Sequence, residues 1–238
     1  MSWGLYEGHQ LLGVALFGVP SHLAVVHNVF PDLQPYHESL VLSRCVLVDA
    51  VPRNGESWFL GQVFAAGARE GLRGVVSFAD PVVRRAADGR LVVPGHAGLI
   101  YQAKGAVALG RLDAATVLVL PDGTTLDRRA LSKVRRGECG HEYVERRLAG
   151  FGVAARRPGE SGGAFLARAL PAAGVVALRH GGCYHYGFRL GVTRAQRATV
   201  RIAMPAGPYP EAIDDTSWRL ATPLTANVVP DVRAPLLV

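Results

Sequence analysis

Short apolar runs separated by turn-forming residues fill the first eighty positions and constrain the fold more than any other feature of the chain. Residues 10–18, 23–30 and 40–49 have the length and apolar content of strands, and glycine and proline residues between them indicate turns. Residues 58–70 have helical character, and residues 74–78 form the next buried apolar run. This order of elements predicts an α+β fold, with one mixed central β-sheet flanked by helices.

The rest of the chain predicts short helices and strands. Val144, Leu148 and Phe151 recur at positions i, i+4 and i+7, which places them on one side of a helix. We expect further helices at 96–104 and from Ser161 to Leu170, and strands at 116–120, 175–178 and 184–190, the last two forming a pair.

A change in composition marks a boundary near residue 205. Residues 205–238 contain six of the 15 prolines, with four acidic residues against two arginines. Proline has no backbone N–H to give to a helix or a sheet, so this segment is predicted to be an extended tail packed on the domain. Residues 1–204 are then expected to form one globular domain.

Composition narrows the class of protein. The chain has 238 residues and is 49% hydrophobic, which suits a sizeable core and is inconsistent with disorder. It lacks an apolar run of the ~18 residues that a membrane helix needs, and its opening residues do not resemble a basic export signal. Three distant cysteines indicate reduced thiols. We therefore expect a cytoplasmic protein with no membrane partner.

Positive charge is concentrated in one window. The chain has 26 basic and 19 acidic residues, and residues 128–157 alone contain nine basic and three acidic residues. A local excess of arginine is typical of a surface that follows a phosphate backbone, since each guanidinium can donate two hydrogen bonds to phosphate. The alternative is a solvated helix face. The predicted DNA-binding residues are Arg128, Arg129, Lys133, Arg135 and Arg136.

The loop at 52–57 joins a buried strand to a helix and is a candidate anion site. Backbone N–H groups at the start of a helix point outward and carry partial positive charge, which favours phosphate. Arg53, Asn54 and Gly55 are the predicted cofactor-binding residues. An ordinary capped helix explains the same residues about as well.

An ordered set of short motifs resembles two related groups of proteins. A meander that leads into strand, phosphate-type loop and helix is similar to the GNAT acyltransferase superfamily. Between about residues 13 and 190, the motifs are similar to the Mom family, GNAT-like phage enzymes that modify adenine in DNA. The motifs are Leu42-Ser43-Arg44, Asn54-Gly55-Glu56-Ser57-Trp58, Val76-Ser77-Phe78-Ala79-Asp80, His96-Ala97-Gly98-Leu99-Ile100-Tyr101-Gln102-Ala103, Gly110-Arg111, Leu120-Pro121-Asp122-Gly123 and Leu131-Ser132-Lys133.

The resemblance implies that residues 1–204 are a Mom-type catalytic domain. It also implies transfer of a carbamoylmethyl group to the exocyclic amine of adenine in double-stranded DNA, which protects phage DNA from restriction in the host cytoplasm. That amine is a poor nucleophile, so the enzyme must orient it, remove a proton and stabilise an oxyanion. We expect Glu56 or Asp80 to accept the proton, and Ser57, Ser77 and Tyr101 to orient or donate, although each residue also has a purely structural explanation.

The donor is left open between two classes. A glycyl group on the adenine amine has the same elemental composition as a carbamoylmethyl group, and its free amine can exchange the two nitrogens through a five-membered spiro ring. Activated glycine, including glycyl-tRNA, is therefore one candidate donor, and tRNA would be a second polyanionic partner. Acyl-CoA is the other. Pro52 counts against acyl-CoA, because it stands where GNAT loops have Gln or Arg.

Adenine in a duplex must be flipped out to expose its amine, and aromatic walls would hold the extruded base. His180, Cys183 and His185 have a spacing that could supply three metal ligands, but no second paired motif accompanies them, so strand packing is favoured and no metal is predicted. The candidate aromatic walls are Trp58, Phe78, Tyr101 and Tyr184.

Two other functions remain compatible with the sequence. One is a GNAT acyltransferase that uses acyl-CoA on a small amine or a protein. The other is a DNA-binding protein without catalytic activity.

Overall fold

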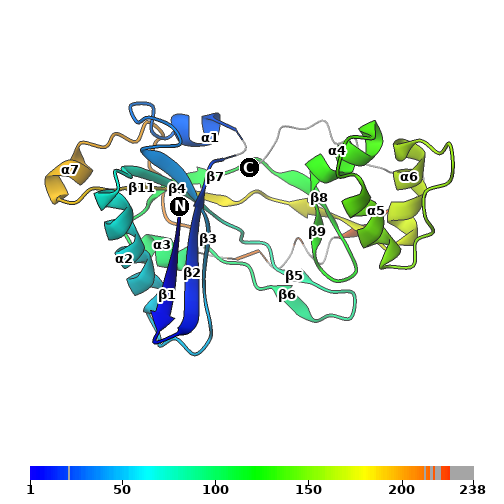
Figure 1. The fold of residues 1–238 in the computed structure, drawn as a ribbon, viewed down its shortest axis with the longest axis horizontal. Helices are drawn as coiled ribbons and strands as arrows, with labels where there is room; N and C mark the ends of the chain where they lie inside the picture. The colour runs from blue at the N-terminus through cyan, green and yellow to red at the C-terminus, as the bar shows by residue number, and fades with distance from the viewer. Residues whose placement is uncertain (21, 212, 215–216, 218–220, 226–238) are drawn as a thin grey trace.

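The computed structural model describes residues 1–20, 22–211, 213–214, 217 and 221–225. Within these residues, two separate sheets are each covered by helices, as Figure 1 shows. Of the predicted tail at 205–238, positions 212, 215–216, 218–220 and 226–238 lie outside the described residues. An α+β fold with a mixed central sheet flanked by helices is confirmed.

The larger sheet has the order β1-β2-β3-β4-β11-β7 among the described residues. Its neighbours are antiparallel except β3 and β4, which are parallel and joined by helix α2. The strands and this helix are β1 (Ser2–Glu7), β2 (Gln10–Gly18), β3 (Ser39–Leu47), α2 (Gly55–Arg69), β4 (Gly74–Ala79), β7 (Val107–Arg111) and β11 (Tyr184–Arg189).

Apolar side chains that alternate between the two faces of this sheet form a hydrophobic core on each face. Leu40, Leu42 and Val75 belong to the cluster that includes Phe59, Leu60 and Phe64 of α2. Val41 and Val76, one position along, pack on the opposite face with Val26, Val29 and Phe30. Successive strand residues point to opposite faces, so both faces of the sheet are covered. The remaining elements around it are α1 (Ala24–His27), α3 (Leu99–Ala103) and α7 (Arg194–Ala198).

The smaller sheet has the order β12-β10-β8-β9 in the described part of the chain. Its helices α4, α5 and α6 lie together at the far end of the molecule from α2 and α7 (Figure 1). Their apolar residues form a separate core with Leu118, Leu120 and Val175. The elements are β8 (Ala115–Val119), β9 (Thr125–Leu126), α4 (Arg128–Arg136), α5 (Glu142–Ala149), α6 (Gly162–Ala172), β10 (Val176–His180) and β12 (Thr222–Pro223).

Two predictions from the sequence are wrong. Residues 23–30 are not a strand but contain the short helix α1, whose residue Val26 packs with Val29 and Phe30 against the sheet. The apolar spacing i, i+3, i+4 fits a helical turn better than a strand. The strands at 175–178 and 184–190 exist as β10 and β11, but they do not pair, because β10 pairs with β8 and β11 with β4 and β7.

The connection from β4 to α3 contains a hairpin formed by β5 (Arg84–Arg85) and β6 (Leu91–Val93). Two described points of the tail contact the larger sheet and this connection. Gly207 N–H donates to the carbonyl of Ala108 in β7. Asp214 N–H donates to the carbonyl of Pro81, and the carbonyl of Asp214 accepts from Val83 N–H. The described part of the tail therefore joins the edge strand β7 to the end of β4. Within the described residues, none of the helices combines the length and the apolar character needed to cross a bilayer.

Candidate functional site

A cleft opens where the two parallel strands separate. β3 and β4 pair from Ser39 and Gly74 to Leu42 and Ser77, and no further pairing continues between them in the described residues. Ligands of α/β sheets bind at the carboxyl ends of parallel strands, where diverging main chains leave a crevice. Here the crevice has a volume of about 650 Å³. Its lining includes Ser43, Arg44, Cys45, Glu56, Phe78, His96, Leu99, Tyr101 and Glu211.

Glu56, His96 and Tyr101 give the cleft its polar character. Partial burial lowers the pKa of His96, although Asp80 and Glu56 oppose the shift, so the imidazole is neutral near pH 7. Burial raises the pKa of Tyr101, with the neighbouring Ser77 hydroxyl working in the opposite direction. The phenol therefore keeps its proton at neutral pH. A neutral base and a protonated phenol share the cleft with the exposed carboxylate of Glu56.

The loop before α2 brings Glu56 to the cleft. Asn54 has a φ of 70° and precedes the first helical residue, which turns the chain sharply into the helix. A Cβ on Gly55 would lie 2.3 Å from Cγ1 of Val51, so a larger residue here would force Val51 to move. The Ser57 hydroxyl donates to the carbonyl of Asn54 over 3.0 Å. Arg53, Asn54 and Ser57 do not line the cleft, whereas Glu56 does.

Asp80 lies in an adjoining hollow of about 320 Å³. Its Oδ1 accepts from the amide of Val82 over 3.0 Å and lies 2.8 Å from Nε2 of His180, and its Oδ2 lies 3.0 Å from a guanidinium nitrogen of Arg84. Burial acts to raise the pKa of Asp80, but these three partners outweigh it and the pKa is lowered. Asp80 is therefore a fixed, ionised carboxylate.

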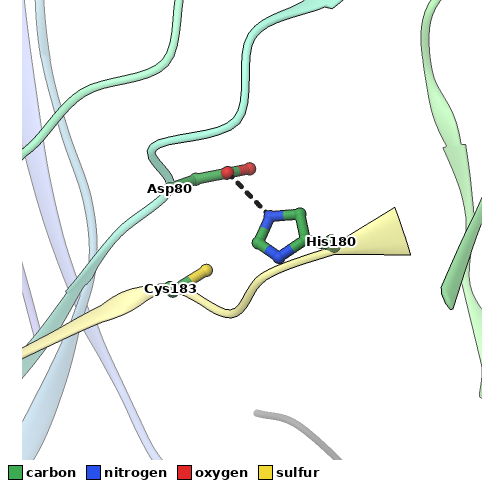
Figure 2. A group of neighbouring side chains, drawn as sticks. All are labelled: Asp80, His180 and Cys183. Carbon is green, nitrogen blue, oxygen red and sulfur yellow. Dashed lines mark hydrogen bonds and ion pairs between the residues drawn. The ribbon is translucent and has the colours of Figure 1, made fainter. Parts of the chain in front are cut away.

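The hydrogen bond to Nδ1 of His180 indicates which ring nitrogen carries the proton. Gly182 N–H donates to Nδ1 of His180 over 3.0 Å, so Nδ1 is an acceptor and Nε2 carries the proton that is donated to Asp80. Figure 2 shows this bond, with Cys183 beside the pair. The residues come from the ends of β4 and β10, so the bond links the two sheets.

Asp80, His180 and Cys183 are the described residues that could hold a metal ion, with ligand atoms within 4.8 Å of one another. The hydrogen bonds fit a metal poorly, because a metal on Nε2 would displace the proton given to Asp80 and leave Nδ1 needing one where it now accepts. Burial and Asp80 raise the pKa of Cys183 to about 12, which favours the thiol over the metal-binding thiolate. His185 is absent from this group.

His185 instead supports Phe78, which lines both the cleft and the hollow. The two rings are stacked with centroids 4.9 Å apart. Burial lowers the pKa of His185 to about 4, so the ring is neutral. Phe78 is thus a common wall between the two cavities, fixed from behind by a second ring. Among the other aromatic candidates, Tyr101 lines the cleft, Tyr184 lies under the guanidinium of Arg111, and Trp58 is 55% exposed.

All five predicted DNA-binding residues lie on one helix, α4, whose Leu131 and Val134 are buried in the second core. The side chain of Asp127 caps the helix by accepting from the amide of Ala130. Arg128 and Arg129 line the hollow that contains Asp80, and Lys133, Arg135 and Arg136 do not. Glu138 pairs with both Arg129 and Arg136, at 2.9 and 3.5 Å. Part of the positive charge of α4 is therefore compensated within the protein.

Among the cleft residues that sequence reasoning missed are His96, Arg44 and Glu211. His96 stands in a motif of the family resemblance, so its place in the motif was a usable signal. Arg44 also lies in such a motif. Glu211 carries no signal, because it reaches the cleft only through the path of the tail, where Pro210 accepts a hydrogen bond from the Gln102 side chain.

Comparison with known proteins gives one decisive match. The Mom protein family matches residues 1–156, well over half of the chain. The chain belongs to the Mom protein family. No curated protein matches it significantly. Among the solved structures that do match is a tandem GNAT protein from the clavulanic acid biosynthesis pathway, without AcCoA, at 11% identity and a TM-score of 0.33; the alignment covers 81% of this chain and 59% of that one.

The Mom match contains the parallel strands, the α2 loop, Asp80, His96, Tyr101 and the whole of α4. It ends before His180, Cys183, the central strand β11 and Glu211. The part that matches the Mom family therefore contains the predicted site residues. His180, which bonds to Asp80 from the smaller sheet, and Glu211, the tail residue in the cleft, lie beyond it.

Proposed function

We propose that this protein modifies adenine in double-stranded phage DNA, adding a carbamoylmethyl group to the exocyclic amine and so protecting the DNA from restriction. One observation carries the proposal: the cleft with Glu56 and Tyr101 adjoins the hollow with Arg128 and Arg129 across the shared ring of Phe78. Groups suited to proton transfer thus lie next to groups suited to phosphate. Membership of the Mom family supports DNA modification as the class of function.

In this mechanism, the duplex lies against α4 and an adenine is extruded toward Phe78, which offers a face for stacking. Arg128 and Arg129 at the hollow contact the phosphates beside the extruded nucleotide, and Lys133, Arg135 and Arg136 extend this contact along the helix. Base and donor then meet at the mouth of the cleft. The fixed carboxylate of Asp80 holds the end of β4, which follows Phe78, to the end of β10.

Glu56 is the better of the two candidate proton acceptors. It lines the cleft and is exposed to a bound substrate, whereas the oxygens of Asp80 are already occupied by His180, Arg84 and Val82. As the adenine amine attacks the donor carbonyl, the amine proton passes to Glu56. The Tyr101 hydroxyl, with Ser77 beside it, donates to the developing oxyanion or to the leaving group.

Charge in the cleft favours an amine-bearing donor. Glu56 and Glu211 outnumber Arg44 among the charged residues that line it, and their carboxylates attract the ammonium group of an aminoacyl donor. An activated glycine such as glycyl-tRNA fits this charge, with its acyl bond broken and its alcohol released. The free amine of the glycyl product then attacks the purine carbon and expels the original nitrogen, which ends as the terminal amide. This sequence conserves all atoms and needs no oxidant.

The test is mass analysis of nucleosides from the DNA of cells that express the protein, with cells lacking the gene as control. A modified deoxyadenosine is expected, and feeding isotopically labelled glycine should label it. A modified base without label would reject the glycine donor and leave acyl-CoA. Unmodified DNA together with tight acetyl-CoA binding would instead indicate an acyltransferase acting on a small amine or a protein.

A further inference from the structure

A second pocket, away from the cleft, is lined by four cations. The C-terminal half of α2, the turn after α3, the end of β11 and the region of α7 enclose about 280 Å³. These elements lie at the end of the molecule opposite α4, as Figure 1 shows. None of the twelve residues that line the pocket, all of them described, is acidic. The cations are Arg69, Lys104, Arg189 and Arg197.

Main-chain carbonyls hold two of these cations, Arg189 and Arg197, in place without neutralising them. Arg189 donates from Nε to the carbonyl of Val200 over 2.9 Å, and Arg197 donates from Nη1 to the carbonyl of Gly191 over 3.2 Å. Lys104 reaches across α2 at a glycine: a Cβ on Gly61 would lie only 2.7 Å from the lysine Nζ. The missing side chain at position 61 therefore makes room for the ammonium group.

The four cations line one pocket without a carboxylate among its lining residues. Arg84, Arg168 and Arg201 each pair with a carboxylate, at distances of 2.7 to 3.0 Å. Among the described residues, no such pair involves any of the four cations of the pocket. Like charges that converge without a counter-ion repel one another, and a bound anion removes that cost. Phe64 and Phe188 form an apolar floor, which strengthens the attraction for an anion.

We propose that this pocket binds a phosphate group, at a site separate from the candidate catalytic cleft. Guanidinium groups donate paired hydrogen bonds to phosphate oxygens, and the lysine adds a compact charge. The phosphate belongs either to a nucleic acid backbone or to a small phosphorylated compound. The proposal does not depend on adenine modification, because it concerns binding alone.

The test compares two double variants that remove the same total charge. Arg69→Gln with Lys104→Gln removes two of the four positive charges that line the pocket. Among the described residues, neither side chain makes a hydrogen bond that holds the fold. Arg90→Gln with Arg194→Gln is the control, since these arginines lie outside the pocket. Pyrophosphate binding is measured by titration calorimetry at constant ionic strength. The pocket variant should bind at least about tenfold more weakly, whereas the control should stay within about twofold of the parent.

The single variant Lys104→Arg keeps the charge and should keep the affinity, which separates loss of the site from loss of the fold. Affinity for a short DNA duplex is then measured against salt. A backbone source predicts that the pocket variant loses about two units of the salt slope, and a small-molecule source predicts an unchanged slope. Equal losses in both double variants, or unchanged pyrophosphate binding in the pocket variant, would overturn the proposal.

Discussion

The cleft and the hollow share Phe78 but hold their polar groups in opposite ways. In the cleft, Glu56 is exposed, His96 has a lowered pKa and Tyr101 a raised one, so a carboxylate, a neutral imidazole and a phenol face the same space. In the hollow, Asp80 is bound by three partners. A group that accepts a proton from a substrate needs a lone pair that no protein hydrogen bond already uses. A group that holds two strands together, in contrast, needs its lone pairs to be used in hydrogen bonds. The difference supports the proposal that proton transfer occurs in the cleft and that Asp80 has a supporting role in the hollow.

The largest expected effect tests the first half of this comparison. Glu56→Gln removes the proposed proton acceptor while preserving the shape of the side chain, and the rate of adenine modification should fall by about a hundred- to ten-thousandfold. Quantitative nucleoside mass analysis measures the rate. Glu70→Gln, at the exposed other end of the same helix, is the matched control and should keep full activity. Full activity in Glu56→Gln would move proton transfer out of the cleft.

The second effect concerns the wall between the two cavities. Burial lowers the pKa of His185 from 6.5 to about 4, so below pH 6.5 the unfolded chain binds a proton that the folded chain does not. Through His185, stability should therefore fall as pH drops from about 6.5 to 4, by at most about 3 kcal/mol. The lowered pKa of His96 adds a decline of the same sign in this window, and the stabilisation from the lowered pKa of Asp80 is lost mainly below about pH 3.8.

Urea unfolding at several pH values measures this decline. His185→Phe keeps a ring stacked on Phe78 but cannot be protonated, so its stability should change much less between pH 6.5 and 4. An equally steep decline in the variant would show that other groups cause it.

The smallest effect tests the second half of the comparison. Asp80→Asn preserves the bond to the Val82 amide but leaves Arg84 without its counter-charge, and should lower the free energy of unfolding by about 2 kcal/mol. Any loss of activity should follow the loss of folded protein. Denaturant unfolding and activity are therefore measured on the same samples. A stable Asp80→Asn protein without activity would make Asp80 the proton acceptor.

Strands β2, β3 and β4 of the larger sheet could be predicted from the sequence because their signals are local, whereas β1 and β7 were not predicted. Apolar runs at 10–18 and 40–49, the loop at 52–57 and the run at 74–78 each identify an element without reference to distant residues, and together they give the strand, loop and helix that place Glu56. Residues 23–30 were misassigned because apolar content alone does not distinguish a strand from a helical turn. Periodicity would have favoured the helix.

The smaller sheet and the hollow depend on contacts that local patterns do not encode. β8, β10 and β12 come from distant parts of the chain, and the bond between Asp80 and His180 spans a hundred residues. The sequence pointed to His180 and Cys183 as neighbours, but it paired them with His185, whose ring packs behind Phe78, rather than with Asp80. The roles of Ser57, Ser77 and Tyr101 stay predictions.

The void between β3 and β4 exists because two main chains part after Leu42 and Ser77, and not because side chains are small there. Exchanging the residues around it would reshape its surface while leaving the scaffold intact. In such an architecture, a few substitutions at the rim can change which ligand the cleft accepts while the residues that build the backbone scaffold stay the same.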